Sequence, residues 1–160
     1  MCNQIPYNLV ERGVEVELLP YAVAADVCIT SYRPVLLGLF AGKYQPGQPL
    51  PEDSRGQVDG RIVSWLEKYA DGFQKFNSFA QDHGLHPAQL AVAWQRKSKG
   101  LSCPIVGVSS ASQLDASIAA FDFDLTDTQY DEVTGFFDTA VKEEAGGQFP
   151  NWRRSFDIVS

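Results

Sequence analysis

The strongest constraint on the fold of this chain is the alternation of short strand-like segments with longer helical ones. Residues 1–6 and 102–106 are short and apolar, and residues 27–32 are rich in β-branched and small apolar side chains, so each segment predicts a strand. Helical patterns separate them, and this alternation predicts parallel strands joined by crossover helices. Because three strands cannot close a barrel, the chain is either a small open α/β sheet or the end of something larger.

The helices are predicted from the spacing of apolar residues and from capping residues. Helical patterns cover residues 15–25, 62–82, 87–100, 113–120 and the stretch that begins after Thr126. The continuous part of the first should begin near Pro20. The second has apolar residues at steps of three and four, which predicts one amphipathic helix that stops at Gly84. Ser110 or Ser112 is expected to cap the fourth helix, and Thr126 the last.

A long segment between the second strand and the next helix does not fit any regular element. Residues 33–60 contain prolines and glycines at short intervals, which interrupt both helix and strand. Loops of this length inside a compact domain are usually functional or disordered. The segment therefore predicts an irregular loop and is the first place to look for binding residues.

Charge and hydropathy exclude two classes of partner. The formal net charge is −7, whereas a nucleic-acid-binding protein would normally show a basic patch that displaces counterions. The longest apolar run covers residues 35–41, far short of the roughly 20 residues that cross a bilayer. Residues 1–8 have neither the basic start nor the apolar stretch of a secretory signal. We therefore expect a cytoplasmic protein with neither a nucleic-acid nor a membrane partner.

Cysteine and histidine do not form a metal motif. Cys2, Cys28 and Cys103 are widely spaced, and each lies in a short apolar segment, where a free cysteine usually behaves as a small buried hydrophobe. We expect three reduced, buried thiols. His83 and His86 have no third ligand type near them in the sequence, so no metal site is predicted.

Four stretches carry a resemblance to a known family. In chain order they read NQIPYNLVERGVEVELLPY (residues 3–21), SYRPVLLGLFAGKY (31–44), HGLHPAQLAVAW (83–94) and PIVGVSSASQLDASIAA (104–120). They resemble the sixth strand, the seventh strand, a following helix and the eighth strand of the aldo-keto reductases. The pattern is most similar to the branch that includes potassium-channel β subunits. In the first stretch the residues that match in register are Gln4, Tyr7, Asn8, Leu9, Arg12 and Glu15.

The resemblance implies a fold and a division of the chain. It implies the C-terminal part of a (β/α)8 TIM barrel, with strands six to eight and their helices, so that the barrel is incomplete. Residues 1–145 would form this half-barrel, and residues 146–160 a C-terminal tail. Met1 falls at a strand position, which suggests a start within a longer reading frame.

The nicotinamide end of a cofactor site is implied by two strand ends. In the family, a glutamine of strand six hydrogen-bonds the carboxamide and an aromatic residue at the end of strand seven stacks on the ring, which here would be Gln4 and Tyr32. Stacking fixes which face of the ring is presented for hydride transfer. The following loop would supply backbone donors to the pyrophosphate, and its assigned residues are Arg33, Pro34, Val35 and Leu37. Arg33 replaces the usual serine, so it either adds a phosphate contact or fills the pocket differently.

The phosphate that distinguishes NADP from NAD is implied to meet Lys43 and Arg55, which match basic residues of the channel-subunit branch. Lysine suits phosphate as a point charge and arginine as a fork. NADP is therefore the expected cofactor, with NAD as the alternative. Gly107 and Ser109 lie where strand meets helix, where a small residue and a helix N-terminus favour an anion.

The adenosine end is implied to meet Gln113 and Ser117, which are four residues apart on one helical face. Ala116 and Ser117 stand where the family has a Glu-Asn pair that holds adenine and ribose. Each lost hydrogen bond costs about 0.5–1.5 kcal/mol, so adenosine recognition should be weaker than in the family.

Catalysis is the part of the family pattern that this chain lacks. Family catalysis uses an Asp, a Tyr, a Lys and a His from the first four strands, and nothing here replaces them, so no catalytic residue is assigned. Three hypotheses follow: part of a reductase that acts on small aldehydes or ketones, a non-catalytic nucleotide-binding or interaction module, or a truncated inactive fragment. The strand edges at residues 1–6 and 102–106 should be exposed and invite association.

Overall fold

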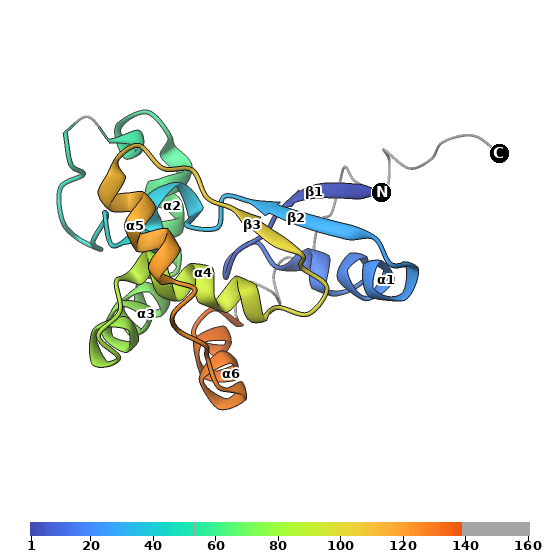
Figure 1. Ribbon diagram of the computed structural model, residues 1–160. Coiled ribbons are helices and arrows are strands. Elements are labelled where there is room, and N and C mark those ends of the chain that lie inside the picture. Colours follow the sequence, from blue (N-terminus) through green and yellow to red (C-terminus); the bar gives the residue numbers. More distant parts are fainter. Residues whose placement is uncertain (53, 139–160) are drawn as a thin grey trace.

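The fold is a three-stranded parallel sheet with helices packed on one of its faces (Figure 1). The computed structural model describes residues 1–52 and 54–138, so the predicted tail at 146–160 lies outside the described residues. The strands are β1 (Cys2–Pro6), β2 (Cys28–Tyr32) and β3 (Cys103–Ile105), in the order β1-β2-β3. This confirms the predicted α/β class and the parallel strands.

The helices follow the predicted order. They are α1 (Leu18–Ala25), α2 (Gly60–Lys68), α3 (Ala70–Asp82), α4 (Pro87–Lys97), α5 (Ala111–Ala119) and α6 (Asp127–Gly135), with short 3-10 turns η1 (Gly13–Glu15), η2 (Leu36–Ala41) and η3 (Arg55–Gln57). The last two turns lie in the predicted irregular loop. Ser110 caps α5 by accepting a hydrogen bond from the N–H of Gln113, and Thr126 caps α6. Pro20 is the third residue of α1, where its missing N–H has no intrahelical acceptor to lose.

The prediction of one helix over residues 62–82 is wrong, because the chain kinks at Tyr69 between α2 and α3. Tyr69 has φ −114° and ψ 28°, outside the helical region. The backbone hydrogen bonds nevertheless continue through the kink, since Tyr69 N–H donates to Trp65 and Phe73 N–H donates to the carbonyl of Tyr69. The apolar residues keep their spacing through the kink, so the sequence pattern does not register it.

An aromatic cluster joins the η2 loop to the helices. Phe40 of η2 contacts Phe73 and Phe76 of α3 with ring centroids 5.1 and 5.0 Å apart, and Phe137, just after α6, contacts Phe40 at 5.3 Å. All four side chains are buried. The contacts of Phe40 with Phe76 and Phe137 are edge-to-face, and such pairs add about 0.5–1.5 kcal/mol each to the burial of the rings. The long loop is therefore anchored in the core near its start.

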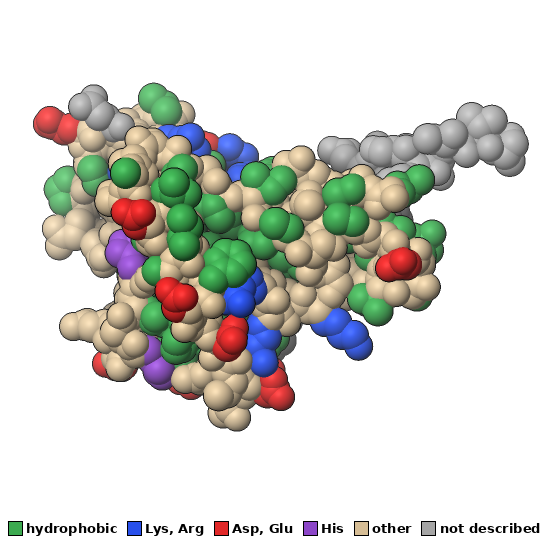
Figure 2. Space-filling view, viewed as in Figure 1, with side chains coloured by type: hydrophobic (Ala, Val, Ile, Leu, Met, Phe, Trp, Pro, Cys, Tyr) green, Lys and Arg blue, Asp and Glu red, His purple; other side chains and the backbone are tan. Residues whose placement is uncertain are grey.

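The two faces of the sheet differ sharply in exposure. Ile5 and Ile29 point toward the helices and are buried, whereas the residues that alternate with them are on the open face. All three cysteines are free and exposed, so the prediction of buried thiols is wrong. The cause is the two-residue period of a strand, which places Cys2, Cys28 and Cys103 on the open face. Figure 2 shows hydrophobic side chains, cysteine included, gathered over the strands.

The two histidines make contacts at the ends of helices. His86 accepts a hydrogen bond from the N–H of Ala88 and caps α4, and the ring of His83 stacks on Phe79 with centroids 4.1 Å apart. Among the described residues there is no group of three or more metal-ligating side chains. In that same part of the chain, every helix is too short or too polar to span a bilayer.

Gly72 of α3 lies close to the residues that follow α6, which yields a test of the packing. A Cβ at this position would lie 2.6 Å from the carbonyl oxygen of Phe136 and 2.8 Å from the ring of Phe137. We expect Gly72→Ala to lower the free energy of unfolding by about 1–3 kcal/mol, although alanine is the better helix former. Urea denaturation followed by far-UV circular dichroism measures the change.

Gly135 provides the matched control, because it also lies in a helix but has nothing within 4 Å of an added Cβ. Gly135→Ala should be neutral or stabilise by up to about 1 kcal/mol. Equal effects of the two substitutions would contradict the close approach of α3 to the end of α6.

Candidate functional site

The carboxyl ends of the three strands meet at one edge of the sheet. Pro6, Tyr32 and Ile105 are partners across the sheet and are the last residues of their strands. Gln4 is the partner of Thr30, two residues before this edge, so it lies on the same open face as Tyr32. Gln4 is exposed and Tyr32 is half-buried. The fold thus brings together these two residues, which the sequence predicted as one site.

Arg33 follows Tyr32 and folds back over it. Its backbone has φ 61°, in the left-handed region that few non-glycine residues adopt. The guanidinium carbon lies 5.1 Å from the centre of the Tyr32 ring, and one terminal nitrogen forms an ion pair of 3.0 Å with Glu11. The Nε atom is buried and has no hydrogen-bond partner within the described residues. The Arg33 guanidinium therefore lies over the Tyr32 ring and keeps one N–H donor without a partner among the described residues.

Asn8 and Glu11 hold Arg33 in place, and the sequence reasoning did not assign either of them to the site. Asn8 is fully buried; its amide nitrogen donates to Glu11 (2.8 Å) and to the carbonyl of Arg33 (3.3 Å), and its side-chain oxygen accepts from the N–H groups of Val10 and Glu11. An asparagine that bonds the backbone two residues ahead is a typical turn signal, so Asn8 in the segment NLVERG could have indicated this turn.

The loop after Arg33 has an unusual backbone. Leu36, Leu37 and Gly38 have φ values of 43°, 58° and 103°, and such conformations cost on the order of 1–3 kcal/mol each for a non-glycine residue. Pro34 is buried and Val35 is half-buried, and the carbonyl of Val35 accepts hydrogen bonds from the N–H groups of Gly38 and Phe40. The buried side chains of this loop, among them Phe40, keep the backbone in this strained conformation.

Lys43 and Arg55 come from distant parts of the loop, and a contact between their neighbours ties those parts together. The hydroxyl of buried Tyr44 accepts a hydrogen bond of 3.3 Å from the N–H of Gly56. A Cβ on Gly56 would lie 3.0 Å from the Tyr44 ring, so glycine permits this approach. Lys43 and Arg55 themselves are exposed. The structure therefore places both cations beside one buried contact.

Of the residues predicted at the eighth-strand signature, Gly107 and Ser109 lie just before α5, and Gln113 and Ser117 lie within it. Helix α5 is at the same end as the long loop in the view of Figure 1. Gly107 has open space where a Cβ would be. The side-chain oxygen of Gln113 accepts from the N–H (2.8 Å) and hydroxyl (3.1 Å) of Ser109, and the hydroxyl of Ser117 donates to the carbonyl of Gln113. Ser109, Gln113 and Ser117 are therefore linked to one another on the surface of α5.

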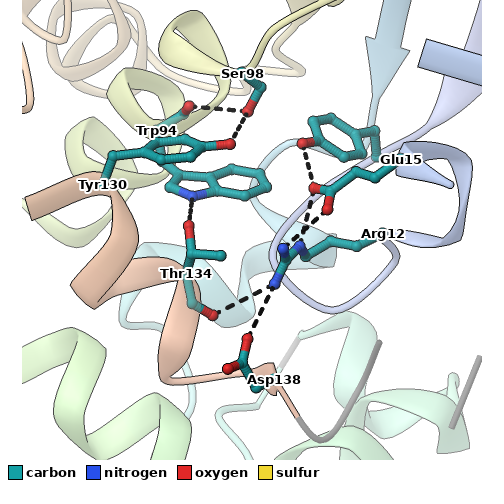
Figure 3. Close-up of polar contacts among 8 residues, drawn as sticks. Arg12, Glu15, Trp94, Ser98, Tyr130, Thr134 and Asp138 are labelled. Atoms are coloured by element: carbon teal, nitrogen blue, oxygen red, sulfur yellow. Dashed lines mark hydrogen bonds and ion pairs between the residues drawn. The ribbon is translucent and has the colours of Figure 1, made fainter. Parts of the chain in front are cut away.

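The remaining residues of the first matching stretch have a structural role (Figure 3). Arg12 donates through Nε and a terminal nitrogen to the carboxylate of Glu15, at 2.9 Å each, and lies 5.9 Å above the Trp94 ring. The phenol of Tyr7 donates to the same carboxylate at 2.7 Å, and Trp94 donates to the hydroxyl of Thr134 at 2.8 Å. Burial, followed by the charge of Glu15, raises the pKa of Tyr7, so this phenol stays protonated.

Two surface hollows lie among the described residues. One is lined by residues of α1 and by Tyr7, Glu15, Lys99 and Tyr130. Another lies between the end of η2 and the start of α4. Neither hollow is lined by the residues predicted to bind the cofactor.

Comparison with known proteins identifies the family. The model of the aldo/keto reductase family matches residues 1–138, and the chain belongs to this family. An L-glyceraldehyde 3-phosphate reductase of Escherichia coli is 32% identical over 127 residues, which is 75% of this chain and 36% of that protein.

Solved structures give the same result for the fold. A glycerol dehydrogenase from Gluconobacter oxydans superposes with a TM-score of 0.72 at 26% identity, over 88% of this chain and 43% of that one. An aldo/keto reductase from Klebsiella pneumoniae, whose structure contains NADP and acetate, gives a TM-score of 0.61 at 22% identity over 85% of this chain and 39% of that one. The chain thus spans less than half the length of each of these relatives.

Glu15 yields a test of the network in Figure 3. Glu15→Ala removes the acceptor of both Arg12 and Tyr7 and leaves an arginine whose side chain is 9% exposed without its main counter-ion. We expect the free energy of unfolding to fall by about 2–3 kcal/mol, measured by urea denaturation. Glu132→Ala, an exposed position on α6, should change it by less than about 0.5 kcal/mol. Similar losses for both variants would show that the network does not stabilise the fold.

Proposed function

We propose that this chain provides the nicotinamide-cofactor-binding part of a carbonyl reductase of its family, with β1, β2 and β3 as strands six to eight of a (β/α)8 barrel. Residues 1–145 would be this part of the barrel and 146–160 its tail. Support comes from the parallel order of the strands and from the family match over residues 1–138. Ligands of such folds bind at the carboxyl ends of the strands.

The observation that carries the proposal is the convergence of Gln4, Tyr32 and Arg33 at that edge. The ring of Tyr32 offers a flat surface for a nicotinamide, and the amide of Gln4, on the same face, suits its carboxamide. Arg33 fits an anionic cofactor, because its buried Nε–H has no partner in the described residues and a phosphate oxygen would satisfy it. Because the Arg33 guanidinium lies over one face of the Tyr32 ring, a nicotinamide would stack on the other face.

The choice of NADP rests on Lys43 and Arg55. Both are exposed cations beside the Tyr44–Gly56 contact, and a 2′-phosphate would satisfy a lysine and an arginine together. Gly107 leaves room for a close approach to the strand end, and the linked group Ser109, Gln113 and Ser117 would meet the adenosine. NAD is the alternative cofactor if these cations do not contact the ligand.

The chain's own part in the reaction is to bind and orient. Bound NADPH would supply the hydride that reduces a small aldehyde or ketone. Tyr32 would fix which face of the nicotinamide ring is presented to the substrate, and Gln4 would set the rotation of the nicotinamide carboxamide. We assign no proton donor to this chain, since the family's Asp, Tyr, Lys and His come from strands that it does not match. We therefore propose that the isolated 160 residues do not turn over substrate.

Cofactor selectivity is the direct test. Titration of the chain with NADPH, followed by tryptophan fluorescence, should show saturable binding that is tighter than for NADH. We expect Lys43→Ala and Arg55→Ala each to weaken NADPH binding about tenfold, as the loss of a charged contact to phosphate implies, and to change NADH binding less than about twofold.

Lys99→Ala is the control, because this exposed lysine belongs to the hollow near α1 rather than to the strand ends. It should leave both affinities unchanged. Absence of saturable binding by either nucleotide, or equal losses for both nucleotides in the Lys43 and Arg55 variants, would contradict the proposed site.

A second candidate function is association with another chain, which the surface of α5 favours. Leu114 and Ile118 of α5 are 47% and 58% exposed, and β1 and β3 each have an open edge among the described strands. Unpaired edges of this kind are templates for another strand. We expect sedimentation velocity to find species larger than the 17.7 kDa monomer. A monodisperse monomer with one cooperative transition in calorimetry would oppose this.

A further inference from the structure

Two of the three cysteines face each other on the open side of the sheet. Cys2 is the first residue of β1, Cys28 is the first residue of β2, and they are direct partners in the register of these strands. Both are free and exposed, and each thiol shifts the pKa of the other. The ladder begins beside them, where the N–H of Cys28 donates to the carbonyl of Met1 at 3.2 Å.

The strand spacing permits a covalent bond between them. Neighbouring strands lie about 4.7–4.9 Å apart, and disulfides join residues whose Cα atoms are about 4.4–6.8 Å apart. Cys103 lies on the same face but is the partner of Thr30, two residues farther along β2 than Cys28. It therefore has no cysteine directly opposite and serves as an internal comparison.

The two thiols are chemically unequal. Hydrogen bonds from Cys2 and then from Ser102 lower the pKa of the Cys28 thiol, because they stabilise its thiolate. The hydroxyl of Ser102 is held in place by accepting the N–H of Ile29 at 3.0 Å. The same contact with Cys28 raises the pKa of the Cys2 thiol, so Cys2 keeps its proton longer. Cys28 is thus the better nucleophile of the pair.

We propose that Cys2 and Cys28 form a thiol–disulfide exchange site, whose substrate is a low-molecular-weight disulfide. The Cys28 thiolate attacks one sulfur of that disulfide, forming a mixed disulfide and releasing one thiolate, which takes up the proton lost by Cys28. Cys2 then loses its proton and attacks the Cys28 sulfur, and the second small thiolate leaves and takes up that proton. The sum converts one protein dithiol and one small disulfide into one protein disulfide and two small thiols.

The product would join the edge strand β1 to the central strand β2 at their amino ends. A crosslink there closes the segment that contains η1 and α1, and so restricts the unfolded chain. We expect the oxidised form to melt roughly 5–10 °C above the reduced form. This site is independent of the cofactor residues, which lie at the opposite ends of the strands.

The test uses the full purified chain, reduced and then incubated with oxidised glutathione. Trypsin separates the three cysteines into peptides that end at Arg12, at Lys43 and at Lys142, so mass spectrometry identifies each pairing. We expect the loss of two hydrogens in the intact mass and one crosslink, between the Cys2 and Cys28 peptides. The crosslink should survive Cys103→Ser and disappear in Cys28→Ser, with circular dichroism confirming that both variants are folded.

Several results would overturn the proposal: a crosslink mainly between Cys28 and Cys103, disulfides only between separate chains, or stable glutathione adducts on all three cysteines at similar rates. Equal loss of the crosslink in the Cys28→Ser and Cys103→Ser variants would have the same meaning.

Discussion

The fold depends on the ion pair between Arg12 and Glu15, which lies between the end of β1 and the packed helices. Arg12 is nearly buried, forms two hydrogen bonds to Glu15 and lies over the ring of Trp94 in α4. One of its terminal nitrogens also contacts the carbonyl of Thr134 in α6 at 3.4 Å. A guanidinium is costly to bury unless all its donors are satisfied. The burial of Arg12 therefore restricts how β1, α4 and α6 can pack together.

Helix α4 connects this ion pair to the sheet. Its Gln95 is fully buried, donates to the carbonyl of Tyr7 at 3.0 Å and accepts a 2.5 Å hydrogen bond from Ser31 of β2. The stacked rings of Tyr7 and Trp94, with centroids 5.3 Å apart, close the same contact. With one face of the sheet so occupied, the alternate side chains must face outward. Tyr32 and Gln4 are therefore on the open face for the same reason that Ile5 and Ile29 are in the core.

Periodicity and capping chemistry suffice to predict the strands, the helix order and the cap at Thr126, because these are local properties, and they limit the cap of α5 to Ser110 or Ser112. The kink at Tyr69 could not be predicted, since the residues around it keep helical spacing and their hydrogen bonds continue. The cysteines were predicted as buried because the sequence of an apolar strand does not show which of its two faces is exposed. That depends on which side of the sheet the helices cover. In the site, the resemblance predicted that Gln4 and Tyr32 act together, and the strand register places them on one face. The position of Arg33 could not be predicted, because it depends on Asn8 and Glu11, which only the folded turn brings near it.

We propose that one edge of this sheet, at the carboxyl ends of β2 and β3, is a surface for a nicotinamide cofactor. Hydrogen exchange followed by mass spectrometry, with and without NADPH, tests it most directly. We expect slower exchange in residues 28–43 and 103–117, with α1 and α6 unchanged. Protection confined to the hollow between α1 and Tyr130, or none at residues 28–43 at saturating NADPH, would contradict it.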